Sequence, residues 1–217
     1  QESNLDRPSH EIASKVAKGE AEMGHSFTDV MGGLDHRLWV FEAPYFFRDY
    51  QHLEGVFEGP VGLELLEGLR AHSLVGLSFT YSGGASGIAS VDREIRGPED
   101  MKGLKVGVYG AGHAVNEAWL KNLGATPVPI KHGEEAGTIG LARQGSLDAV
   151  NITWRNFARY RLDRSFKYVN MMSSSYLVSV TYINEKFFEG LPESYRVLLK
   201  EASREAGRIE RAKTIEL

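Results

Sequence analysis

The spacing of apolar and polar residues alternates along the chain between a helical period and a strand period. Helical spacing covers residues 10–19, 59–73, 114–125, 134–145 and 190–217. Strand-like apolar runs cover residues 21–27, 75–81, 104–108, 126–130, 146–153 and 176–183. Because the strands alternate with helices, the pattern predicts an α/β protein built from βαβ units. The glycine-rich stretch SGGASGIASV, residues 82–91, is either flexible or a strand that crosses between two parts of the protein.

Two segments far apart in the chain share one pattern. KVAKGEAEMGHSF and LARQGSLDAVNIT each combine a basic helix end, a glycine, an acidic residue and a strand that ends in polar residues. The glycines are Gly19 and Gly145, and the acidic residues are Glu22 and Asp148. Two similar α/β units predict two lobes. Ligands of open α/β sheets bind beyond the carboxyl ends of the strands, so the strand tips of both lobes are expected to line a ligand cleft.

A glycine-rich turn follows the strand LKVGV and is similar to a nucleotide-binding loop. Gly110 and Gly112 supply a G-x-G pattern, but Val115 stands at the third glycine position. The next strand, TPVPI, has no acidic residue at its tip to bind a ribose, and no Gly-Lys-Ser/Thr follows the turn. The pattern therefore favours an ordinary βαβ connection, and a Rossmann-like nucleotide-dependent oxidoreductase is kept as the alternative.

Composition narrows the class of partner. The chain of 217 residues has a net charge of −4 with both signs interspersed, which disfavours nucleic acid as a partner. The sequence has no apolar run near 18 residues, so no direct membrane insertion is expected. It contains no cysteine, which excludes disulfides, thiol catalysis and thiolate metal sites.

The residues that usually carry catalysis are scattered. The seven histidines form no H-E-x-x-H pair, and the group His113, Glu117, His132 and Glu134 is more typical of solvated surface residues than of metal ligands. Ser86 lies in GGASGIA, which lacks the G-x-S-x-G spacing of a nucleophile elbow. The sequence therefore predicts a binding protein that is not an enzyme and that needs no metal or other cofactor.

Four stretches in series resemble one known family. They are FEAPYFFRDYQHLEGVFEGPVGLELLEGL, REIRGPEDMKGLKVGV, LGATPVPI with LARQGSLDAVN, and SYLVSVTYINEKFFEGLPESYRVLLKEASREAG. Together they are similar to the DctP-type solute-binding proteins of TRAP (tripartite ATP-independent periplasmic) transporters. The resemblance implies a periplasmic, two-lobed receptor that captures a small molecule by hinge closure and delivers it to TRAP membrane permease subunits. A sensory module that transports nothing is a further alternative.

The resemblance also implies where the lobes begin and end. Lobe I is expected to hold residues 1–82 and 174–212, and lobe II residues 83–173 and 213–217. Family members are typically longer, opening with a strand–helix–strand and ending with further helices. The chain is therefore expected to be shortened at both ends, with part of the lobe I sheet missing.

One departure from the family pattern concerns ligand charge. Family members usually carry an arginine where this chain has Gly107, and often another near Ser86 or Gly87. Such guanidinium groups bind a carboxylate with two parallel hydrogen bonds. Their replacement predicts a neutral or less acidic ligand, or an anion that is held in another way. Arg155, just past a strand tip, is the candidate replacement cation.

The candidate ligand-binding residues combine strand-tip position with family position. Lobe I is expected to supply Thr28, Glu42 and Tyr45. The crossing between the lobes is expected to supply Tyr81 and Ser86. Lobe II is expected to supply Gly107, Tyr109, His132, Asn151, Trp154 and Arg155. Aromatic side chains with a few polar groups suit a small-molecule cleft, although the aromatic run at 39–50 is also typical of a core. The predicted ligand is a small polar metabolite, either an organic acid or a less acidic relative.

Overall fold

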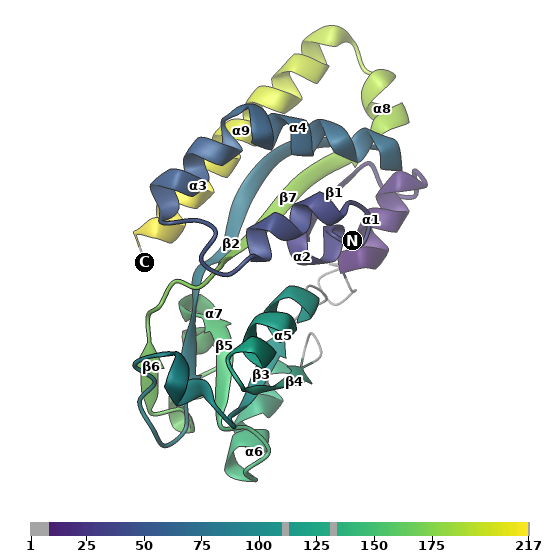
Figure 1. The fold of residues 1–217 in the computed structure, drawn as a ribbon. Helices are drawn as coiled ribbons and strands as arrows, with labels where there is room; N and C mark the ends of the chain where they lie inside the picture. The colour runs from purple at the N-terminus through teal and green to yellow at the C-terminus, as the bar shows by residue number, and fades with distance from the viewer. Residues whose placement is uncertain (1–8, 110–112, 131–133, 217) are drawn as a thin grey trace. The chain divides into compact units, whose positions relative to one another are not determined.

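The computed structural model describes residues 9–109, 113–130 and 134–216, which group into two compact units. Among these residues, unit 1 comprises 9–40, 47–82 and 178–216, and unit 2 comprises 41–46 and 83–177. Two strands take part in both units: β2 (Leu74–Ser90) begins in unit 1 and ends in unit 2, and β7 (Tyr176–Asn184) runs the opposite way (Figure 1).

The other elements follow the predicted alternation. Those in unit 1 are α1 (Ser9–Ala17), β1 (Met23–Phe27), α2 (Thr28–Met31), η1 (His36–Glu42), α3 (Tyr50–Phe57), α4 (Pro60–Gly68), η2 (Leu69–His72), α8 (Glu185–Glu189) and α9 (Glu193–Ile215), with the end of η1 in unit 2. Those in unit 2 are η3 (Pro98–Met101), β3 (Lys105–Tyr109), α5 (His113–Asn122), β4 (Thr126–Ile130), η4 (Glu135–Gly137), α6 (Thr138–Arg143), β5 (Ala149–Thr153), α7 (Trp154–Arg159), η5 (Leu162–Arg164) and β6 (Tyr168–Asn170). None of the helices within the described ranges is long and apolar enough to cross a membrane.

Unit 1 packs long helices over the first half of β2. Strand β7 pairs antiparallel with β1 and is the neighbour of β2 on its other side. Helix α9 lies alongside α3 and α4 in Figure 1. The ring of Phe57 on α3 stacks on Phe79 of β2 with the ring centroids 5.0 Å apart. This contact ties the helical layer to the strand.

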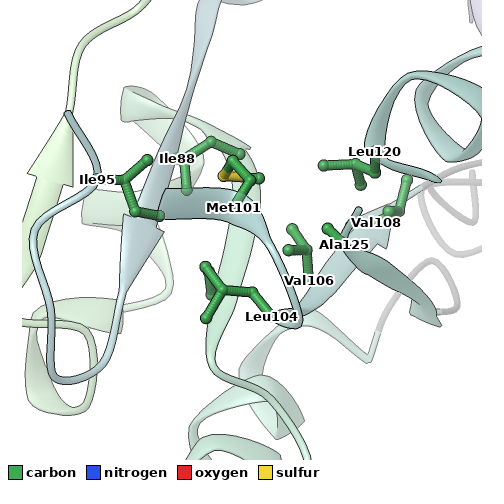
Figure 2. Packing of buried hydrophobic residues seen from close by; sticks show 9 residues of the cluster. Ile88, Ile95, Met101, Leu104, Val106, Val108, Leu120 and Ala125 are labelled. Carbon is green, nitrogen blue, oxygen red and sulfur yellow. The ribbon is translucent and has the colours of Figure 1, made fainter. Parts of the chain in front are cut away.

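Unit 2 contains a sheet whose central strands β3 and β5 are largely buried on both faces. Strand β3 runs parallel to β4 and β5, and β5 and β6 both pair antiparallel with β2. Alternate residues of β5 enter different clusters: Ala149 packs with Val106, Val108 and Leu120 on one face, and Val150 packs on the other face. Figure 2 shows the first cluster, in which Leu120 of α5 meets Val108 of β3. Burial of both faces explains why these strands read as continuous apolar runs.

The unit boundaries differ from the expected lobe boundaries in three places. Residues 41–46 group with unit 2, where the backbone N–H of Tyr45 donates to the carbonyl oxygen of Ser174 at 2.6 Å. Residues 174–177 also group with unit 2. Residues 213–216 stay with unit 1 because α9 continues to Ile215 without a break.

Candidate functional site

The carboxyl ends of the parallel strands in unit 2 gather several of the predicted residues at one edge of the sheet. In the antiparallel pairing of β2 with β5, Ser86 lies opposite Thr153 and Ile88 lies opposite Asn151. Directly opposed residues of two strands project to the same face, and so do residues two apart on one strand. Ser86 and Asn151 therefore share a face, and it is the face whose core includes Ile88.

Helix α5 covers this face and adds a polar group that the sequence-based prediction did not include. Leu120 of α5 is part of the core cluster, and Asn116 lies one helical turn before it, so both face the sheet. The Asn116 side chain is 8% exposed, and its Oδ1 atom has no hydrogen-bond partner among the described residues. The available signal was a polar residue in the stripe Asn116–Leu120–Leu123, where the helical period expects an apolar one.

Asn151 is a second buried amide on the same face. It is 8% exposed, and it lies opposite Ile88 in the pairing of β5 with β2. A buried acceptor without a partner, such as Asn116 Oδ1, is unusual, because native proteins satisfy most of their buried polar groups.

Tyr45 completes this face with a partly exposed aromatic ring. Its backbone adopts φ 59°, and its ring lies edge-on to Trp119 of α5 with 6.2 Å between centroids. The hydroxyl contacts the sulfur of Met172 at 3.3 Å, and burial raises the pKa of the phenol. Ser174, which accepts from the Tyr45 N–H, also donates its own N–H to the carbonyl oxygen of Ser86 at 3.0 Å. We call Tyr45, Ser86, Asn116 and Asn151 the α5-face cluster.

The opposite face of the same sheet holds three other predicted residues. The hydroxyl of Tyr109 is 2.9 Å from Thr138 Oγ1, a contact with α6. A Cβ at Gly107 would lie 3.1 Å from Val150 Cγ1. A Cβ at Gly87 would lie 2.7 Å from the ring of Trp154, which packs edge-on to Phe157. The structure therefore places Gly107, Tyr109 and Trp154 on the face away from Asn151.

Arg155 lies at the start of α7, directly after the end of β5. Thr153 caps this helix by accepting from the backbone N–H of Asn156 at 3.4 Å. The Arg155 side chain is exposed, and it forms no ion pair with any residue that the structure describes.

Four predicted residues remain, of which two belong to unit 1 and one belongs to unit 2. Thr28 is fully buried in unit 1 and donates its hydroxyl to the carbonyl oxygen of Val178 at 3.1 Å. Tyr81 is also fully buried in unit 1, where burial and then the nearby Glu54 carboxylate raise the pKa of its phenol. Glu42 is a buried carboxylate of unit 2, at the end of η1. His132 lies outside the described residues.

No group of three or more His, Cys, Asp or Glu residues among the described side chains is arranged to hold a metal ion. The sequence offers His113 and His132 as possible metal ligands, and both side chains lie outside those that the structure describes.

Comparison with known proteins identifies relatives over most of the chain. The family model DctP, described as bacterial extracellular solute-binding protein, family 7, matches residues 2–217. The C4-dicarboxylate-binding periplasmic protein DctP of Rhodobacter capsulatus is 29% identical over 77% of this chain and 48% of its own length. The chain spans 48% to 60% of the length of the first curated relatives that it matches.

Solved structures show the same fold. A TRAP periplasmic solute-binding protein from Pseudomonas aeruginosa with bound L-malate has a TM-score of 0.84 at 22% identity, covering 98% of this chain and 71% of that one. One from Sulfitobacter with bound β-D-galacturonate has a TM-score of 0.84 at 18% identity, covering 98% and 69%. These likenesses confirm the predicted two-lobed α/β fold.

Proposed function

Because the chain belongs to family 7 of the bacterial extracellular solute-binding proteins, the DctP family, we propose that it is a receptor that captures a small polar metabolite. The receptor delivers this solute to the permease subunits of a TRAP transporter and works in the periplasm, without chemical turnover. The observation that carries the proposal is the family match over residues 2–217. The same match disfavours the oxidoreductase alternative.

The α5-face cluster supports the proposal with suitable chemistry. Small-molecule sites combine apolar and aromatic walls with a few well-placed polar groups. The cluster offers the rings of Tyr45 and Trp119 beside the hydroxyl of Ser86 and the amides of Asn116 and Asn151. We infer that this face of unit 2 contacts the solute, and that β2 and β7 carry the hinge closure that the family resemblance implies.

Native mass spectrometry of the gently purified chain tests the receptor function. We expect a retained small molecule of roughly one to a few hundred daltons, in keeping with the size of ligand that such sites enclose. When this molecule is released, the mass of the protein should be that of the unmodified chain. A mass of the chain alone, together with no thermal shift from organic acids, sugar acids or neutral sugars, would contradict the proposal.

Arg155 provides a test of ligand charge. If the solute is acidic, Arg155→Gln should weaken its binding about 10-fold, because a charge-assisted hydrogen bond is worth about 1.5–3 kcal/mol. Isothermal titration with β-D-galacturonate and with galactose distinguishes an acidic solute from a neutral one, since only galacturonate carries a carboxylate. The matched control is Arg159→Gln, an exposed arginine at the other end of α7. Equal losses for both variants, or for both sugars, would rule out a specific role for Arg155.

A further inference from the structure

Helix α9 contacts the backbone of β2 directly, just before β2 passes from unit 1 into unit 2. The Glu210 carboxylate accepts the backbone N–H of Tyr81 at 2.7 Å, and Nη1 of Arg211 donates to the carbonyl oxygen of Phe79 at 2.8 Å. In a strand, the C=O of one residue and the N–H of the second residue after it point to the same edge. Two adjacent residues of α9 therefore bond this edge of β2 as a neighbouring strand would. We call Glu210 and Arg211 the α9 clamp.

Close packing of the helix against β2 holds the α9 clamp in position. A Cβ at Gly207, one turn before Arg211, would lie 2.9 Å from the carbonyl oxygen of Phe79, so a glycine at this position allows the helix to approach the strand. One turn earlier, the hydroxyl of Ser203 lies 2.8 Å from that of Ser78. The helix therefore follows the strand at short distance over its inner face.

Beyond the α9 clamp, β2 contains a short segment with unusual backbone geometry. Pairing with β5 begins at Ser86, whose N–H also donates to the carbonyl oxygen of Ser175 at 2.8 Å. Between Tyr81 and Ser86 lie Gly83 and Gly84, with φ 155° and 75°, values that glycine adopts at little cost. Strand β7, which also takes part in both units, contains no glycine. The adaptable part of β2 thus lies between two parts that are held by other elements.

We propose that the α9 clamp holds β2 in unit 1 as far as Tyr81, so that movement between the two units takes place by bending at residues 82–85, with Gly83 and Gly84 as the pivot. Hinges of this kind are a few residues that absorb a change in φ and ψ. Glu210 and Arg211 are then positioning residues, which act on the movement through β2. The proposal deepens the receptor function proposed above, because it names the side chains that confine hinge closure to one place.

Amide hydrogen exchange, followed residue by residue by NMR, tests the α9 clamp. Glu210→Leu removes the acceptor of the Tyr81 N–H, and this amide should exchange at least about 10-fold faster, since hydrogen bonds to charged groups are the stronger ones. Ser86, whose N–H donates to Ser175 in unit 2, is the control amide and should exchange as in the wild-type chain. Glu210→Gln keeps a carbonyl acceptor and should retain most of the protection. Unchanged exchange at Tyr81 in Glu210→Leu, or equal acceleration at Tyr81 and Ser86, would overturn the proposal.

The distance between two spin labels, measured by pulsed electron paramagnetic resonance without solute, tests the movement between the units. Because the sequence contains no cysteine, Glu64→Cys on α4 and Lys121→Cys on α5 place one label on an exposed position of each unit. We expect Glu210→Leu to broaden the distribution of label distances, because bending of β2 is then no longer confined to residues 82–85. Glu205→Leu, at an exposed position of the same helix, should leave the distribution unchanged.

The label distances also separate failure of this inference from failure of the receptor function. An unchanged distribution in Glu210→Leu, or equal broadening by Glu210→Leu and Glu205→Leu, would overturn the inference even if the chain retains a solute. Retention of no solute in native mass spectrometry would contradict the receptor function, whereas hydrogen exchange and label distances decide the α9 clamp without any solute.

Discussion

Replacing Arg211 by methionine should lower the free energy of unfolding by about 1.5–3 kcal/mol, because hydrogen bonds that a buried guanidinium donates are lost. Arg211 is 2% exposed on α9, and its Nε donates to the Glu54 carboxylate at 2.8 and 2.9 Å. Its Nη1 donates to the carbonyl oxygen of Phe79 at 2.8 Å. Methionine has a similar length but no donor, so the Glu54 carboxylate and the Phe79 carbonyl oxygen each lose the hydrogen bond that Arg211 donates. Urea denaturation of the two proteins measures the difference.

Arg208 is the control for this change, because it lies on the same helix and is exposed. It pairs with Glu205 one turn earlier, and surface pairs of this kind contribute little. Arg208→Met should therefore change the free energy of unfolding by less than about 0.5 kcal/mol. Arg211 also donates to Glu58 and lies 5.4 Å from the ring centroid of Phe57, so it joins α9 to α3. Equal effects of the two substitutions would show that this network does not hold α9 in place.

The sequence predicted the α/β alternation because its local signals are strong. Gly19 follows α1 and Gly145 follows α6, and both adopt a left-handed backbone, with φ 76° and 70°. Glycine accepts this conformation at little cost and so ends helices. Each glycine leads into a strand, β1 and β5, as the shared pattern of the two segments predicted. The internal similarity is therefore confirmed at the level of helix, turn and strand.

For the glycine-rich residues 82–91, local sequence signals do not decide between a loop and a strand. Their composition fits a flexible loop as well as a strand, yet β2 continues to Ser90. Partners that are distant in sequence stabilise it: the N–H of Ser86 donates to Ser175 O at 2.8 Å, and Ile88 pairs with Asn151. Pairing across long sequence separations cannot be derived from the segment itself, because strand propensity depends on the neighbours.

The choice of sheet face was the part of the candidate site that could not be predicted. The sequence indicates where strands end, and on that basis it predicts that Gly107, Asn151 and Trp154 line one site. Alternation along a strand is visible in a sequence, but the register between strands is not. Here the register places Asn151 on the α5 face and Gly107 on the other. Asn116 was missed for a related reason, since only packing shows which side of α5 faces the sheet.

Replacing Gly107 by arginine should destabilise the chain by at least about 3 kcal/mol and should not create a carboxylate site. A Cβ at this position would lie 3.1 Å from Val150 Cγ1, 3.4 Å from Leu147 Cδ1 and 3.5 Å from Ile130 Cγ1. Overpacking a core costs about 1–3 kcal/mol, and burying a guanidinium without a partner adds to this. Chemical denaturation and isothermal titration with succinate measure the two effects.

Gly140→Arg is the control, because a Cβ at Gly140 on α6 would meet no atom within 4 Å. It adds the same charge at an exposed position, and replacing a helical glycine should stabilise α6 by about 0.5–1 kcal/mol. Suppose instead that Gly107→Arg were as stable as wild type and bound succinate. The new arginine would then contact the ligand from the face of β3 that packs against Val150. The solute would then lie away from the α5-face cluster, and the inference that this cluster contacts the solute would fail with it. Destabilisation without gain of succinate binding would agree with the close packing around Gly107.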